Sequence, residues 1–180
     1  MRVVAIVGMT GSGKSEVSRV FEEAGYRRIR FGDITDEEVE KRGLRLNETN
    51  ERFIRESLRA QHGMAVYAKL SIPKIDKALE KSNVVADGLY SWEEYELLKK
   101  KYGDLLVVVA VWASPRKRYF RLGVRDIRPL TREEAIARDK SEIENLNKGG
   151  PIAMADYTLT NEHTKASLLR QAKRLIEKLS

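Results

Sequence analysis

A glycine-rich loop between a strand-like run and a helix-like run constrains the fold of this chain most. Residues 3–7 are apolar and mostly β-branched, and residues 15–24 carry apolar side chains at the spacing of an amphipathic helix. Between them stands the pattern G-x-x-x-x-G-K-S, whose glycines let backbone N–H groups surround phosphate oxygens at a helix start. The pattern predicts a nucleoside triphosphate site made of Gly8, Met9, Thr10, Gly11, Ser12, Gly13, Lys14 and Ser15.

Two side chains of this loop and one aspartate have distinct expected roles. Lys14 is expected to reach the β- and γ-phosphates, and the Ser15 hydroxyl is expected to hold Mg²⁺. Asp87 ends the apolar run 84–87, where an aspartate in a P-loop fold commonly holds the metal through water. The alternative for Asp87 is an ordinary Asp-Gly turn. We therefore expect ATP and Mg²⁺ as the cofactors.

Strand-like and helix-like segments alternate along the chain, which predicts an α/β fold with a parallel sheet sandwiched by helices. Patterns of Ser or Thr followed three residues later by Glu predict helix starts at Thr35, Ser91 and Thr131. Pro73 is expected to break the helix predicted over 63–81, because proline lacks a backbone donor. The five expected strands cover residues 3–7, 26–31, 83–87, 105–112 and 157–160.

Composition limits the class of protein. A length of 180 residues predicts a single domain, 1–180, and the absence of cysteine excludes disulfides and thiolate metal sites. No apolar run approaches the roughly 20 residues of a membrane helix, and the start lacks a signal-peptide pattern. A cytoplasmic protein without membrane contact is the expectation, and the oligomeric state is left open.

Arginines gather in the region 114–145. Residues 114–138 hold seven arginines and one lysine against three acidic residues. A solvated helix face is the ordinary explanation, but arginine in excess of lysine favours bidentate phosphate recognition. The proline-containing segment 126–130 predicts a turn, so this region is expected to form a helical hairpin that acts as a lid. Arg125 and Arg138 are the expected cations that stabilise the transferring phosphoryl group.

A helical insertion over residues 35–81 is expected to bind the phosphoryl acceptor. Asp33 ends the second expected strand, where it either caps the following helix or presents a carboxylate to the acceptor. Within the insertion, Arg55 and Arg59 are candidate contacts to an acceptor phosphate. Tyr90, which follows the Asp-Gly turn, is a third candidate acceptor contact.

The order of these motifs resembles the P-loop kinases of nucleotides and nucleotide-like molecules over essentially the whole chain. The pairs Gly32-Asp33 and Asp87-Gly88 are similar to adenylate-kinase-like enzymes. The second half is similar to dephospho-CoA kinase through residues 121–126, 131–135, Arg138, 155–157 and Asn161. Three shorter segments resemble an archaeal and bacterial group of such kinases: Leu58-Arg59, 63–65 and 113–115.

The resemblance implies roles for the matching positions. In dephospho-CoA kinases the matching arginines, Arg121 among them, belong to the lid, the segment around Asn161 approaches the adenine, and the position of Asp33 is the proposed base. Two departures leave the acceptor open. Ile72-Pro73 stands where those kinases carry His-Pro, and residues 89–91 stand where adenylate kinases carry Phe-Pro-Arg.

These observations predict an ATP- and Mg²⁺-dependent phosphotransferase. The expected acceptor is a nucleotide or nucleotide-like small molecule: a nucleoside or deoxynucleoside monophosphate, or dephospho-CoA. The alternative is an ATPase or ATP-dependent switch acting on RNA or a protein partner, which the net charge of +7 favours. Nucleic-acid binding is the less favoured hypothesis, because no aromatic-rich basic strand pattern of the kind that stacks bases is present.

Overall fold

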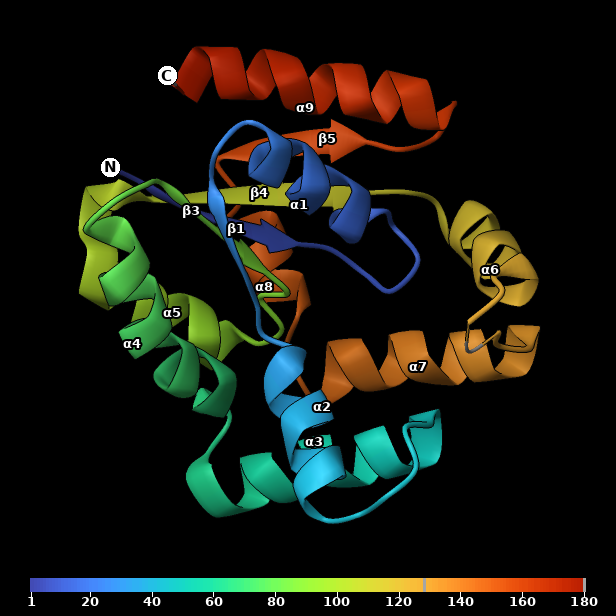
Figure 1. The fold of residues 1–180 in the computed structure, drawn as a ribbon. Coiled ribbons are helices and arrows are strands. Elements are labelled where there is room, and N and C mark those ends of the chain that lie inside the picture. Colours follow the sequence, from blue (N-terminus) through green and yellow to red (C-terminus); the bar gives the residue numbers. More distant parts are fainter. Residues whose placement is uncertain (128, 180) are drawn as a thin grey trace.

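A parallel five-stranded sheet lies at the centre of the fold (Figure 1). The structure is a computed structural model that describes residues 1–127 and 129–179. Every pairing between neighbouring strands is parallel, and the strand order is β2-β3-β1-β4-β5. The predicted α/β fold and its five strands are confirmed. The strands are β1 (Val3–Val7), β2 (Arg27–Arg30), β3 (Val84–Asp87), β4 (Leu106–Trp112) and β5 (Tyr157–Thr160).

Helices cover both faces of the sheet, which explains why its central strands are apolar throughout. On one face Val3, Ala5 and Val7 of β1 belong to a core with α4 (Val66–Leu79) and α5 (Trp92–Tyr102). Side chains of alternate residues point to the other face, where α1 (Lys14–Glu23) and α9 (Lys165–Leu179) complete a second core. Figure 1 shows α9 and α1 on one side of the sheet and α4 and α5 on the other.

Helices α2, α3, α6 and α7 lie beyond the carboxyl ends of the strands, where ligands bind in open α/β sheets. There, α2 and α3 contact each other, and α6 and α7 form the expected hairpin (Figure 1). None of the helices in the described ranges has the length and apolar character needed to cross a membrane. The bounds are α2 (Asp33–Lys41), α3 (Glu48–His62), η1 (Gly103–Leu105), α6 (Pro115–Val124), α7 (Arg132–Glu144) and α8 (Gly149–Ala153).

Two of the predicted helix starts are confirmed and one is wrong. The hydroxyls of Ser91 and Thr131 accept the backbone N–H of the residue three positions later, and Thr131 has the complete reciprocal box. Thr35 instead lies inside α2, which begins at Asp33. Its buried hydroxyl is 2.7 Å from the Tyr67 hydroxyl, so a tertiary partner replaces the expected cap.

The predicted break at Pro73 is also wrong. The helix α4 runs without interruption from Val66 to Leu79 with Pro73 inside it. Proline removes one hydrogen bond of the helix ladder. The buried side chains of Tyr67 and Ile75 on either side pack into the core, and packing of this kind supplies most helical stability in proteins.

Candidate active site

The loop between β1 and α1 has the backbone that a phosphate cradle requires. Gly8, Gly11 and Gly13 all have positive φ angles, of 148°, 81° and 106°. A Cβ at Gly13 would lie 2.5 Å from the amide nitrogen of Asn161, so a side chain there collides with its neighbour. The Ser12 hydroxyl is buried without a hydrogen-bond partner among the described residues, which suits a site that accepts a polar ligand.

Lys14 lies against this loop at the start of α1. Its Nζ donates to the carbonyl oxygens of Gly8 at 2.8 Å and Met9 at 3.1 Å. Burial lowers the pKa of Lys14 to about 8, and the nearby Lys148 ammonium acts in the same direction. The carboxylates of Glu142 and Asp87 oppose both effects, so all three residues lie close enough to influence this lysine.

The predicted metal-binding pair lies at this edge of the sheet. Ser15 follows Lys14 in the first turn of α1, and Asp87 is buried at the end of β3. Arg28 of β2 holds one carboxylate oxygen of Asp87, with Nη2 at 2.5 Å and Nε at 3.1 Å. A hydroxyl and a carboxylate beside a phosphate cradle are the oxygen ligands that Mg²⁺ uses together with phosphates and water. Within the described ranges no group of three or more His, Cys, Asp or Glu side chains forms a separate metal site.

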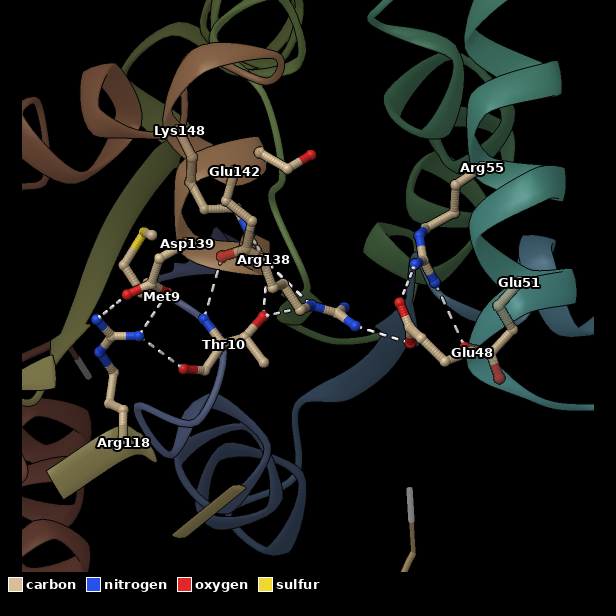
Figure 2. Close-up of polar contacts among 12 residues, drawn as sticks. Met9, Thr10, Glu48, Glu51, Arg55, Arg118, Arg138, Asp139, Glu142 and Lys148 are labelled. Carbon is tan, nitrogen blue, oxygen red and sulfur yellow. Dashed lines mark hydrogen bonds and ion pairs between the residues drawn. The ribbon is translucent and has the colours of Figure 1, made fainter. Parts of the chain in front are cut away.

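Arg118 fastens the hairpin of α6 and α7 to the phosphate loop (Figure 2). Its guanidinium is buried and binds both carboxylate oxygens of Asp139 in α7, at 2.7 and 2.6 Å. The same group donates to the carbonyl oxygens of Ala113 and Thr10, each at 3.1 Å. All of these acceptors are protein groups, so the role of Arg118 in this structure is to hold the hairpin against the phosphate loop.

Arg121 and Asn161, both expected at the nucleotide, are brought together beside the loop. Arg121 Nη2 donates to the backbone oxygen of Asn161 at 2.7 Å and to its side-chain oxygen at 3.2 Å. The Asn161 side-chain amide in turn donates to the Ser12 carbonyl oxygen at 2.8 Å. A continuous chain of hydrogen bonds therefore links α6, the end of β5 and the phosphate loop.

The two arginines expected to act on the phosphoryl group occupy different places. Arg138 of α7 reaches the loop, with Nε 3.2 Å from the Thr10 hydroxyl, and its Nη1 lies 2.8 Å from Glu48 of α3. Arg125 follows the last residue of α6 and is partly exposed. Arg128, another arginine of the predicted lid, lies outside the described residues.

Sequence reasoning missed a buried pair, Glu142 and Lys148. Glu142 accepts the backbone N–H of Thr10 at 3.1 Å and its hydroxyl at 2.5 Å, and Lys148 Nζ is 2.9 Å from the same carboxylate. Burial raises the pKa of Glu142, but the Lys148 and Lys14 cations outweigh it and hold that pKa far below the usual range. A glutamate on a charged helix and a lysine in an Asn-Lys-Gly turn carry no sequence signal for this pairing.

A cavity of about 940 Å³ lies on the far side of this pair. Side chains of α2, α3 and α7 line it, together with Tyr90, Glu142 and Lys148. The Tyr90 ring meets the ring of Tyr67 edge to face, with centroids 5.7 Å apart. The expected acceptor insertion therefore does supply walls of a cavity next to the phosphate loop.

The predicted acceptor residues differ in how they are held. Arg55 is paired with Glu48 at 2.7 Å and Glu51 at 3.4 Å. Arg59 stacks over the Tyr67 ring at 5.0 Å, and within the described part of the chain no carboxylate lies within ion-pair distance of it. Its buried Nε has no hydrogen-bond partner there.

Asp33 lies at the rim of the cavity. Its side chain is 48% exposed and forms an ion pair with Arg30 at 2.8 Å. Arg30, Gly32 and Asp36 line the cavity, whereas Asp33 is not among the lining residues. Asp33 is the first residue of α2, and Gly32 occupies the N-cap position without a side-chain cap, so the alternative that Asp33 caps this helix is wrong.

Comparisons with known proteins place the chain in a family. The family described as "AAA domain" matches residues 4–147. A UPF0200 protein of Thermococcus gammatolerans is 38% identical over 181 aligned residues, which cover 98% of this chain and 95% of the relative. The chain belongs to the UPF0200 family.

Solved structures similar to this UPF0200 chain include small-molecule kinases. A gluconokinase from Sinorhizobium meliloti has a TM-score of 0.61 at 18% identity, covering 99% of this chain and 95% of its own. A dephospho-CoA kinase from Campylobacter jejuni has a TM-score of 0.57 at 16% identity, covering 99% and 97%. The predicted P-loop kinase fold is confirmed, and the likeness to dephospho-CoA kinase holds for the fold.

Proposed function

We propose that this UPF0200 chain is an ATP- and Mg²⁺-dependent phosphotransferase with a nucleotide or nucleotide-like acceptor. The observation that carries the proposal is the junction between two sites. The phosphate loop contacts Glu142 and Arg138, and both of these residues also line the separate cavity of about 940 Å³. A triphosphate in the loop and a second substrate in the cavity would therefore meet at the same side chains.

The donor side of the reaction follows from the loop. Lys14 and the loop N–H groups would hold the β- and γ-phosphates, and Ser15 and Asp87 would hold Mg²⁺, which neutralises charge on the phosphates. Arg121 and Asn161 support the loop from the side where the resemblance expects the adenine. Arg138, with Arg125 as a second cation from the lid, would stabilise the moving phosphoryl group.

The residue that would bind the phosphoryl acceptor is inferred from a difference between the two cavity arginines, Arg55 and Arg59. Arg55 is already neutralised by two glutamates, whereas Arg59 has no carboxylate partner within the described ranges. The Arg59 Nε is a buried donor without an acceptor, which is costly, so an anionic group of the acceptor is its natural ligand. We assign that role to Arg59, with Tyr90 as a wall of the cavity and Asp33 at the rim as the group that orients or deprotonates the acceptor.

Simple ATP hydrolysis coupled to RNA or protein is the second hypothesis, and the cavity argues against it. A switch acting on a macromolecule needs no cavity of this size beside its phosphate loop. Small-molecule sites typically have volumes of about 300–1,000 Å³. The cavity, at about 940 Å³, falls within that range and therefore favours a small-molecule acceptor.

The proposal is tested by ³¹P NMR of ATP turnover with Mg²⁺ and a panel of nucleoside monophosphates, deoxynucleoside monophosphates and dephospho-CoA. A new phosphate resonance with one acceptor is the expected result. ADP and free phosphate alone, whichever acceptor is added, would refute it. With the acceptor known, Asp33→Asn is expected to lower kcat roughly 100-fold or more. Asp104→Asn, an exposed carboxylate at the amino end of β4, is the matched control.

A further inference from the structure

Two cationic side chains, Lys148 and Arg138, lie against the Glu142 carboxylate beside the phosphate loop (Figure 2). Lys148 Nζ is 2.9 Å from Glu142 Oε1, and Arg138 Nε is 3.7 Å from the same oxygen. Lys14 lies close enough to be influenced electrostatically by both Lys148 and Glu142. Arg138 has a second carboxylate partner in Glu48, but Glu142 is the carboxylate that Lys148 contacts.

Lys14, Lys148 and Glu142 together carry one more positive than negative charge. The neighbouring Arg138 has Glu48 as a partner, and Asp87, which also influences Lys14, is paired with Arg28. Lys148 is 1% exposed and Glu142 is 6% exposed, so neither charge is compensated by water. Lys14 hydrogen-bonds to neutral carbonyl oxygens, and it therefore adds a second ammonium near the same carboxylate. A buried cluster of this composition binds a further anion favourably, and a terminal phosphate carries the multiple negative charge that would balance it.

Glu142 itself takes the place of an anion at the loop. It accepts both the N–H and the hydroxyl of Thr10, the third residue of the phosphate loop. Backbone N–H groups of such loops ordinarily turn toward phosphate oxygens. An arriving terminal phosphate would therefore compete with Glu142 for Thr10 and also for the ammonium of Lys148.

We propose that Lys148 contacts the terminal phosphate of bound ATP from the side of the acceptor cavity, after exchanging Glu142 for that phosphate. The inference rests on the proposed function of the same site. Lys148 and Glu142 line the cavity and Lys14 does not, so the two lysines would approach the phosphate from opposite sides. During transfer the bond from phosphorus to the bridging oxygen of ADP breaks and a bond to the acceptor oxygen forms. Lys148 keeps its proton throughout and neutralises charge on the non-bridging oxygens.

The alternative is that Lys148 only neutralises Glu142 and anchors the turn between α7 and α8. Nucleotide binding in the absence of an acceptor separates the two explanations. Isothermal titration calorimetry with Mg²⁺ compares ADP with an ATP analogue whose terminal bridge is an imido group. A hydrogen bond to a charged group is worth about 1.5–3 kcal/mol. Lys148→Met is therefore expected to lower the affinity for the analogue roughly 10- to 100-fold. ADP lacks the terminal phosphate, and its affinity is expected to change less than about threefold.

Two further variants keep the test decisive. Lys148→Met combined with Glu142→Gln removes one positive and one negative charge, so the net charge of the cluster is unchanged. This double variant is expected to lose the same discrimination between analogue and ADP even if the single variant fails to fold. Lys140→Met removes an exposed lysine of α7 and is the matched control. Equal weakening of both nucleotides, or unchanged binding of both, in a folded variant would overturn the role of Lys148.

The outcome is independent of whether an acceptor is found. If the wild-type chain phosphorylates an acceptor and Lys148→Met binds both nucleotides like the wild type, only this inference fails. If no acceptor is phosphorylated but the variant loses affinity for the analogue and not for ADP, the proposed contact of Lys148 stands and the proposed transfer reaction fails.

Discussion

Glu94 gives a quantitative prediction about how stability depends on pH. Its side chain is fully buried at the start of α5, where one carboxylate oxygen accepts the Tyr90 N–H at 2.8 Å and the other has no hydrogen-bond partner within the described ranges. Burial raises the pKa of Glu94 from 4.5 to about 7, although the cations of Arg59 and Lys148 act in the opposite direction. The hydroxyls of Tyr67 and Tyr90 are the other titratable groups that this carboxyl influences.

The sign and size of the effect follow from linkage. Between pH 4.5 and about 7 the folded state holds a proton on Glu94 that the unfolded state has lost. Stability therefore falls as the pH rises through this window. A tenfold difference in proton affinity is worth about 1.4 kcal/mol, so the two pKa values correspond to a loss of about 3 kcal/mol.

Glu94→Gln removes this titration and keeps the shape of the side chain. Urea unfolding followed by circular dichroism from pH 5 to pH 8.5 measures the free energy of unfolding of both proteins. Relative to its value at pH 5, the variant is expected to gain about 2.5 kcal/mol over the wild type by pH 8.5. Other groups titrate equally in both proteins, so the difference isolates Glu94. Glu96→Gln, an exposed neighbour on α5, is the control and is expected to give a constant difference. A constant difference for Glu94→Gln would mean that the folded carboxylate stays ionised beside Arg59, and the reasoning would be wrong.

Two further predictions concern arginines with contrasting surroundings. Arg118→Met leaves the Asp139 carboxylate without its buried partner, so the free energy of unfolding is expected to fall by about 3–5 kcal/mol in urea titrations. A loss below about 1 kcal/mol would contradict a structural role for Arg118. Arg59→Met is expected to raise the KM for the acceptor roughly 10-fold while the KM for ATP stays constant, because one charge-assisted contact is lost. Arg55→Met is the matched comparison in the same steady-state assay, and an equal effect on acceptor KM would contradict the assignment to Arg59.

Much of the fold could be predicted from short stretches of sequence. The strand, glycine loop and helix at the start of the chain are set by local backbone preferences, and the glycines have the positive φ angles that such a loop needs. The capping box at Thr131 is local in the same sense, because its partners are three residues apart. Predictions from local rules were wrong where a tertiary contact competed with them. The Thr35 hydroxyl bonds to Tyr67 instead of capping a helix, and α4 continues through Pro73.

The candidate site likewise has one part that the sequence predicts and another that depends on the tertiary structure. The sequence by itself determined the phosphate loop, because the loop is one contiguous segment with its own backbone geometry. Only the tertiary structure decided which charged residues meet it. Thr10 and Glu142 are 132 residues apart, and nothing near either position indicates that they share two hydrogen bonds. Likewise, Arg55 and Arg59 are equivalent in sequence, yet Arg55 pairs with two glutamates while the buried Nε of Arg59 has no hydrogen-bond partner among the described residues. The physical reason is that pairing of buried charges depends on how the helices pack beyond the sheet, and local propensity does not encode that arrangement.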